Sequence, residues 1–301
     1  MPQFGTQNQR HQWYASRNKQ GDAATDQEWS FTGYMKIYST SAFRSFKNFI
    51  GELTSVSAGM NVGISRTIAI LNKSNAADPW QQAALEEGII VSGLKSAHVL
   101  DGVNRLGVVS LYSGFDLFLS DSRSQFHMIH GREWVQYDGD GPFDALFRNS
   151  VGTKTAFQQH FGSHRIASID YYRLVRNAIA HPSKEALQLV RDFYVSESSN
   201  LTLARTEYGM QSAPNSFENI NFHDLKFFAR VSLDVAELIE TYFDPGNERL
   251  ALLVPSGIIK MPKSKIRVKN AIKGWLCCTY GIGQDRANSI IAEHMTHQLG
   301  G

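Results

Sequence analysis

Hydrophobic residues return every three or four positions along most of the chain, which is the spacing of one face of an α-helix. We interpret the stretches with this pattern as helices: 34–53, 64–71, 79–90, 98–120, 143–160, 169–181 and 221–243. A glycine-containing break separates the first two, and 64–71 could instead be a strand. Asp78 followed by Pro79 is a helix start signal, an N-cap and then an N1 proline. The pattern predicts a mainly α-helical protein.

Three parts of the chain depart from this pattern. Residues 187–198 and 201–209 alternate between polar and apolar more closely, which predicts a short strand or hairpin. Residues 1–30 are polar without any period, so we expect them to be mobile or loosely attached. The sequence DPGN at 244–247 predicts a helix stop and a domain boundary. The expected segments are a polar 1–32, a helical extension 33–96, a helical domain 97–245 and a tail 246–301.

Composition narrows the class of protein. With 301 residues, 42% of them hydrophobic, the chain is long enough to bury a sizeable core. The net charge of +2 argues neither for nor against nucleic acid as a partner. The two cysteines are adjacent, so they cannot form a long-range disulfide, and no apolar run reaches the length of a membrane span. We expect a cytoplasmic protein without membrane contact.

The helix predicted over 169–181 carries an unusual polar face. On a helical wheel its apolar arc contains Tyr171, Tyr172, Leu174, Val175, Ala178 and Ile179. Its opposite arc contains Asp170, Arg173, Arg176, Asn177, Ala180 and His181. Arginine offers a planar set of donors that suits phosphate oxygens, and histidine exchanges a proton near neutral pH. The arc therefore has groups that phosphodiester cleavage needs. The alternative is a solvated helix end, where arginine and histidine complement the helix dipole.

The segment DYYRLVRNAIAHPS, 170–183, resembles the signature of HEPN domains, an arginine followed after four to six residues by a histidine. Arg176, Asn177 and His181 fill its places. The stretch SLYSGFDLFLSD, 110–121, looks like the long early helix of such a domain, with Asp116 where many members have an acidic residue. With the last predicted helix, the resemblance covers about 97–243 and implies a HEPN-like helical bundle.

This resemblance implies an activity. Catalytic HEPN proteins are mostly metal-independent endoribonucleases, often toxins or antiviral-defence effectors, whose two motif helices form one site in a homodimer. By this resemblance Arg176 would bind the scissile phosphate and His181 would act as general acid or base. Asn177 would orient the phosphate or His181. Arg173 and Asp116 would support them. The RNA 2′-hydroxyl would be the nucleophile, with no cofactor or metal, and an antitoxin or sensor subunit is a possible partner. The alternative is a non-catalytic HEPN module that binds nucleic acid or regulates another protein.

The tail has the densest cationic cluster of the chain. The stretch KMPKSKIRVKNAIK, 260–273, is rich in lysine and arginine and contains no acidic residue. The GIG that follows resembles a helix-hairpin-helix, in which backbone N–H groups of Gly281 and Gly283 would approach a phosphate. The residues expected to bind nucleic acid are Lys265, Arg267, Lys269, Lys273, Gly281 and Gly283. Two alternatives remain, a tight turn beside solvated lysines and a ribosome-associated or scaffold protein.

Overall fold

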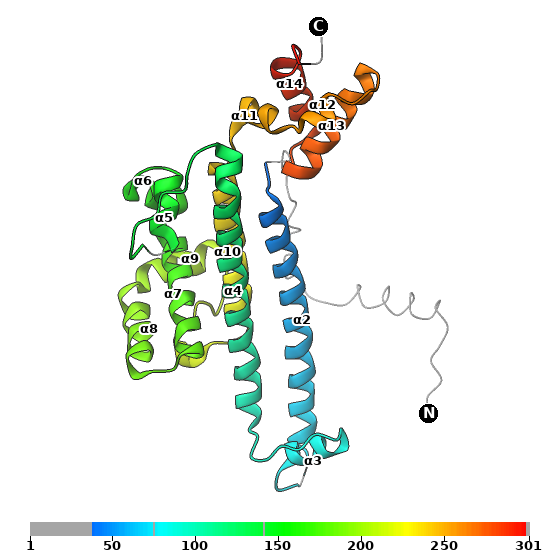
Figure 1. The fold of residues 1–301 in the computed structure, drawn as a ribbon. Coiled ribbons are helices and arrows are strands. Elements are labelled where there is room, and N and C mark those ends of the chain that lie inside the picture. The colour runs from blue at the N-terminus through cyan, green and yellow to red at the C-terminus, as the bar shows by residue number, and fades with distance from the viewer. Residues whose placement is uncertain (1–37, 75, 141, 299–301) are drawn as a thin grey trace, which may run out of the picture. The chain divides into compact units, whose positions relative to one another are not determined.

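The computed structural model describes residues 38–74, 76–140 and 142–298, and these residues contain helices and no strand (Figure 1). The predicted polar segment 1–32 lies outside them. The prediction of a mainly helical protein is confirmed. The helices are α2 (Ser41–Leu71), α3 (Pro79–Glu86), α4 (Ser96–His130), α5 (Pro142–Asn149), α6 (Lys154–Phe161), α7 (Ser163–Ala180), α8 (Lys184–Ser196), α9 (Ser198–Glu207), α10 (Phe222–Tyr242), α11 (Gly246–Leu253), α12 (Ser256–Ile259), α13 (Lys265–Tyr280) and α14 (Gln284–His294).

Capping residues explain where several helices begin. The Asp78 side chain accepts a hydrogen bond from the Gln81 N–H at 3.0 Å and Pro79 is the first residue of α3, as predicted. At the start of α10, Asn221 and Asp224 form a capping box. The Asn221 side chain accepts from backbone N–H groups of the first turn, and the Asp224 side chain accepts from the Asn221 backbone N–H. These local signals are readable in the sequence because they depend on neighbouring residues alone.

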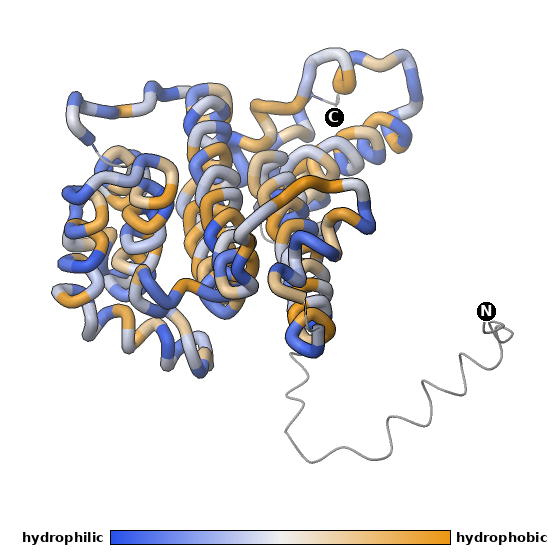
Figure 2. Tube along the Cα trace, turned by 90° about the horizontal axis from the view of Figure 1, so that it is seen from below, coloured by the Kyte–Doolittle hydropathy of each residue, from blue (hydrophilic) through white to orange (hydrophobic). Residues whose placement is uncertain are grey.

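The main core lies between α2, α4, α7 and α10. The long helices α2 and α4 run antiparallel and pack side by side, with α3 in the connection between them (Figure 1). Phe46 of α2 stacks on Phe118 of α4 at 5.2 Å between ring centroids, and Tyr172 of α7 stacks on Phe228 of α10 at 4.6 Å. Hydrophobic and hydrophilic positions alternate along these helices (Figure 2). Most buried apolar residues of 38–96 and 97–245 belong to this one core.

The tail forms a second cluster of buried apolar residues from α11, α13 and α14, which also includes Tyr38 and Ile129. The Ser39 N–H donates to the Tyr280 carbonyl at 2.7 Å. The Arg44 guanidinium of α2 donates to the carbonyls of Cys278 and Thr279 at 3.1 and 3.0 Å. A cation at these last carbonyls of α13 is favourable because they carry the negative end of the helix dipole.

The prediction of a strand or hairpin after Pro182 is wrong, because α8 and α9 occupy this region. Ser183 caps α8, and its side chain accepts from the Ala186 N–H at 3.1 Å. The side chains that pack on the core are spaced as on one helix face: Ala186, Leu187, Val190, Phe193 and Tyr194. Aromatic and β-branched residues favour strands only weakly, and tertiary packing overrode that preference here.

Helix boundaries also differ from the prediction: α3 ends at Glu86 rather than at 90, and α7 begins at Ser163 rather than at 169. Residues 64–71 are not a separate element, because α2 continues through Gly59 and Gly63 to Leu71. The helix predicted over 143–160 is divided into α5 and α6. Gly152 has a positive φ of 82°, and the Thr153 side chain caps α6 by accepting from the Ala156 N–H. The long helix predicted over 98–120 is confirmed and extends to His130 as α4.

Buried Glu240 of α10 makes the stability of the fold depend on pH. Its carboxylate accepts hydrogen bonds from the Thr40 backbone N–H and from the Thr40 hydroxyl, the latter at 2.7 Å. Burial raises the pKa of Glu240 to about 7, and this outweighs the opposing effects of Thr40 and Arg44. The proton is therefore held more tightly in the folded protein than in the unfolded chain.

We expect this group to make folding less favourable as pH rises. Its stabilising contribution is complete below the unfolded pKa near 4.5 and is lost as pH rises through about 7. The loss amounts to about 3 kcal/mol for a pKa difference of this size. Glu240→Gln cannot ionise, so the variant should gain stability relative to wild type between pH 5 and pH 8. Denaturant unfolding at several pH values measures this difference, with Glu248→Gln at an exposed position as the control. A constant difference across this range would contradict the prediction.

Candidate functional site

The apolar arc of α7 is buried, as the helical wheel predicts. Tyr171, Tyr172 and Val175 have no exposed surface, and Leu174 and Ala178 are also buried. The Tyr172 hydroxyl donates to the Asp224 carboxylate of α10 at 2.9 Å. This contact fixes the rotation of α7 against the core. The polar arc is consequently held on the outer side of the helix.

Arg173 and Asp170 form an ion pair within the polar arc. The Arg173 Nε lies 3.0 Å from the Asp170 Oδ1, and both side chains are partly exposed. Burial raises the pKa of Asp170, Arg173 opposes this shift, and the nearby charges of Asp144 and Glu197 add to it. The arc is therefore not purely cationic, because an acidic side chain neutralises one of its two arginines.

Arg176 and Asn177 contact each other directly. The Arg176 Nη1 donates to the Asn177 Oδ1 at 2.9 Å. The centre of the Arg176 guanidinium lies 5.7 Å from the centroid of the Tyr112 ring of α4. Both contacts hold the arginine head near one position, which reduces the conformational entropy that it would lose on binding a phosphate. Arg176 remains partly exposed.

His181 is exposed and lies one residue beyond the last residue of α7, where Pro182 prevents the helix from continuing. Its backbone N–H donates to the Asn177 carbonyl at 2.8 Å. Asn177, itself one of the three predicted catalytic residues, thus contacts the other two, Arg176 through its side chain and His181 through its backbone. The bond to His181 is the last backbone bond of the helix, so the three residues belong to the end of α7.

Tyr112 is a residue of this region that the sequence analysis missed. It is buried on α4, and burial raises its pKa to about 12, although Arg173 and Arg176 oppose the shift. Asp116, one turn later on α4, is exposed and lies near enough to raise the pKa of Tyr112 as well. The four-residue spacing of Tyr112 and Asp116 was the available signal, because residues i and i+4 share a helix face.

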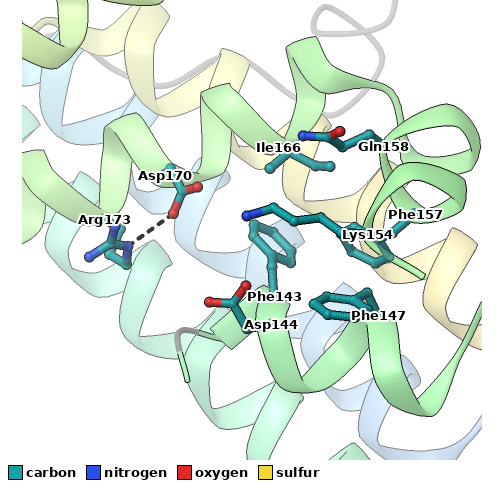
Figure 3. Close-up of a pocket in the computed structure, with 9 residues that line it drawn as sticks. All are labelled: Phe143, Asp144, Phe147, Lys154, Phe157, Gln158, Ile166, Asp170 and Arg173. Carbon is teal, nitrogen blue, oxygen red and sulfur yellow. Dashed lines mark hydrogen bonds and ion pairs between the residues drawn. The ribbon is translucent and has the colours of Figure 1, made fainter. Parts of the chain in front are cut away.

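A pocket of about 190 Å³ lies beside the polar arc (Figure 3). Helices α5, α6 and α7 line it, and Asp170 and Arg173 belong to its wall. Three phenylalanine rings form an aromatic part of the lining, with Phe157 at 5.8 Å from Phe143 and 6.5 Å from Phe147 between centroids. This pocket could not be predicted from the sequence, because its residues come from three helices whose packing is not encoded in local spacing.

The predicted nucleic-acid residues of the tail lie on α13 and at its end. Lys265, Arg267 and Lys269 are exposed, and Lys273 is partly exposed. Gly281 ends α13 in the left-handed region with φ of 64°, and its N–H donates to the Cys277 carbonyl at 3.0 Å. This N–H is thus engaged inside the protein. Gly283 is the N-cap of α14.

Gly281→Ala should lower the free energy of unfolding by about 1–2 kcal/mol, because a side chain in the left-handed region is strained. A Cβ at this position would also lie 2.0 Å from the Ser39 Oγ. Gly274→Ala is the matched control on the same helix, since its Cβ would meet nothing within 4 Å. The control should gain up to about 1 kcal/mol from helix propensity. Denaturant unfolding compares the two, and an equally stable Gly281→Ala would contradict the turn geometry.

Within the described ranges, no three histidine, cysteine, aspartate or glutamate side chains converge as metal ligands would. None of the helices in the described part of the chain has the length and apolar character of a membrane span. No protein-family model, curated protein or solved structure matches the chain.

Proposed function

We propose that this chain has a HEPN-like helical domain and acts as a metal-independent endoribonuclease. The observation that carries the proposal is the contact of Asn177 with both Arg176 and His181 at the outer end of α7. A guanidinium held by Asn177, and an exposed imidazole at the end of the same helix, would offer a phosphate its charge partner and a proton carrier. The spacing Arg176–Asn177–x₃–His181 supports the same conclusion, because it fits the HEPN signature.

The proposed reaction is an internal transfer. The RNA 2′-oxygen attacks the adjacent phosphorus, the bond from phosphorus to the 5′-oxygen breaks, and a 2′,3′-cyclic phosphate and a 5′-hydroxyl result. Arg176 would neutralise the phosphate oxygens as charge develops on them, which lowers the barrier electrostatically. His181 would take the proton of the 2′-hydroxyl or give one to the leaving 5′-oxygen. In a two-fold dimer the second copy of α7 would supply the complementary proton carrier.

The biological setting belongs to the same proposal. HEPN-type endoribonucleases act as toxins or antiviral effectors, and a partner that restrains the activity, an antitoxin or sensor subunit, would then be needed in the cytoplasm. The cationic side chains of α13, which are Lys265, Arg267, Lys269 and Lys273, would hold RNA through its backbone. Such binding is independent of sequence and weakens steeply with salt.

A non-catalytic nucleic-acid-binding or regulatory module is the second candidate. The ion pair between Asp170 and Arg173 favours it, because this pair removes one cation from the arc. Such a protein would bind RNA and leave it uncut.

The test is to incubate the purified full chain with total RNA in EDTA, beside Arg176→Ala. Wild type should cut, the variant should not, and the products should carry 2′,3′-cyclic phosphate ends. A DNA strand of the same sequence should stay intact because it lacks the nucleophile. Equal cutting by wild type and Arg176→Ala would refute the proposed site. RNA binding without cutting by wild type would favour the second candidate.

A further inference from the structure

The pocket between α5, α6 and α7 has the chemical character of a nucleobase site. Its volume of about 190 Å³ is below the range of about 300–1,000 Å³ typical of drug-sized ligands, so it suits a single planar ring system. Phe143 and Phe147 line it with partly exposed rings, and Phe157 packs behind them. Aromatic side chains that face a small pocket are the usual stacking surface for an unpaired RNA base.

Polar groups of both signs surround these rings. Figure 3 shows Asp144 and Lys154 at the aromatic lining, with Asp170 and its ion-pair partner Arg173 across the pocket from α5. Gln158 adds an amide, which both donates and accepts. Each side of the rim therefore carries a carboxylate near a cation, Asp144 with Lys154 and Asp170 with Arg173. A ligand that matches it must present donors and acceptors along its edges.

Among the RNA bases, guanine matches this rim best. Its N1–H and N2–H₂ are adjacent donors that one carboxylate accepts together, while O6 and N7 are acceptors for a lysine or arginine. Adenine and cytosine present an amino donor without the neighbouring imide donor. Uracil presents a single N–H between two carbonyls. The other bases would match fewer of the rim groups.

We propose that this pocket binds a guanine base of an RNA strand, beside the phosphate that Arg176 contacts. The inference rests on the proposed endoribonuclease site for its position but not for the binding itself. Arg173 of the pocket wall and Arg176 of the phosphate site are one helical turn apart, about 4.5 Å along the axis at 1.5 Å per residue. One nucleotide, or two adjacent ones, can therefore place a base in the pocket and a phosphate at Arg176. The pocket would thus direct cleavage to bonds that flank guanosine.

Binding is tested with the full chain carrying His181→Ala, so that the probe stays intact. Fluorescence anisotropy measures the affinity for labelled pentaribonucleotides UUGUU, UUIUU and UUAUU, where I is inosine, which lacks the N2 amino group. UUGUU should bind about tenfold more tightly than UUAUU, with UUIUU between them, as expected for loss of a bidentate base contact. Equal affinities for the three strands would overturn the proposal.

Two variants connect this preference to the pocket. Asp144→Asn should abolish the preference for guanosine, whereas Asp138→Asn, at an exposed position outside the lining, should keep it. Phe143→Leu retains apolar bulk but removes stacking, so it should weaken UUGUU binding by about tenfold or more. A guanosine preference that survives both Asp144→Asn and Phe143→Leu would show that another part of the protein reads the base.

Further measurements distinguish an RNA strand from a free nucleotide as the source of the base. They also distinguish failure of the base pocket from failure of the endoribonuclease proposal. If guanosine monophosphate displaces UUGUU with an affinity equal to that of UUGUU, the pocket is a free-nucleotide site. That result would overturn the assignment to an RNA strand. Cleavage by wild type without enrichment of guanosine at the cut sites would refute the base pocket and leave the endoribonuclease intact. Guanosine-selective binding by a chain that never cuts RNA would support the pocket and refute the proposed function.

Discussion

His181→Ala should lower the rate of RNA cleavage by about 10²- to 10⁴-fold, the range that a positioned general acid or base contributes. His181 is exposed at the end of α7, and its backbone is bonded to the Asn177 carbonyl. Replacing its side chain therefore removes the proton carrier without opening a cavity in the core. The free energy of unfolding should change by about 0.5 kcal/mol or less.

Single-turnover cleavage of a labelled RNA, with protein in excess, measures this loss at the chemical step. His297→Ala is the control, because His297 is an exposed histidine of the tail, outside the motif helix. The control should cut at the wild-type rate. A His181→Ala protein that cuts as fast as the control would show that another group carries the proton, even if Arg176 is required.

Asp224→Ala should be the most destabilising single substitution among those considered, at about 3–5 kcal/mol. Asp224 is fully buried, and its carboxylate accepts four hydrogen bonds, from the Tyr172 hydroxyl, the Asn221 N–H, and the Asn215 N–H and side-chain amide, all at 2.8–2.9 Å. Alanine leaves the buried Tyr172 hydroxyl and the partly buried donors of Asn215 and Asn221 without this acceptor. Because Tyr172 belongs to α7, the loss should also loosen the helix that carries Arg176 and His181.

Denaturant unfolding measures the loss, and Asp192→Ala provides the matched control. Asp192 is exposed on α8 and accepts one hydrogen bond, from Gln188. Its replacement should cost about 0.5 kcal/mol or less. Hydrogen exchange of the α7 amides reports the second effect, and faster exchange is expected in Asp224→Ala alone. A loss below about 1 kcal/mol would contradict the network.

The chemistry on α7 explains why the sequence was informative about the candidate site. Arg176, Asn177 and His181 lie within six positions of one another, so their relation depends on the geometry of a single helix turn and its proline stop. The same local argument predicted the buried arc around Tyr172 and Val175. The local argument could not reveal that Asp170 pairs with Arg173 and so occupies this arginine. Side chains three residues apart on a helix can contact either each other or a ligand.

The sequence by itself determined which segments are helical where apolar residues are evenly spaced, as in α4 and α7, or where a cap marks the start, as in α3 and α10, because these signals are local. Only the tertiary structure decided the rest. Residues 184–207 are helical because Val190 and Phe193 pack on the core in this conformation. The intrinsic strand preferences of these residues are too weak to determine the secondary structure. The ring of Tyr112 near Arg176, and the pocket shared by α5, α6 and α7, depend on contacts between distant segments, which no local spacing specifies.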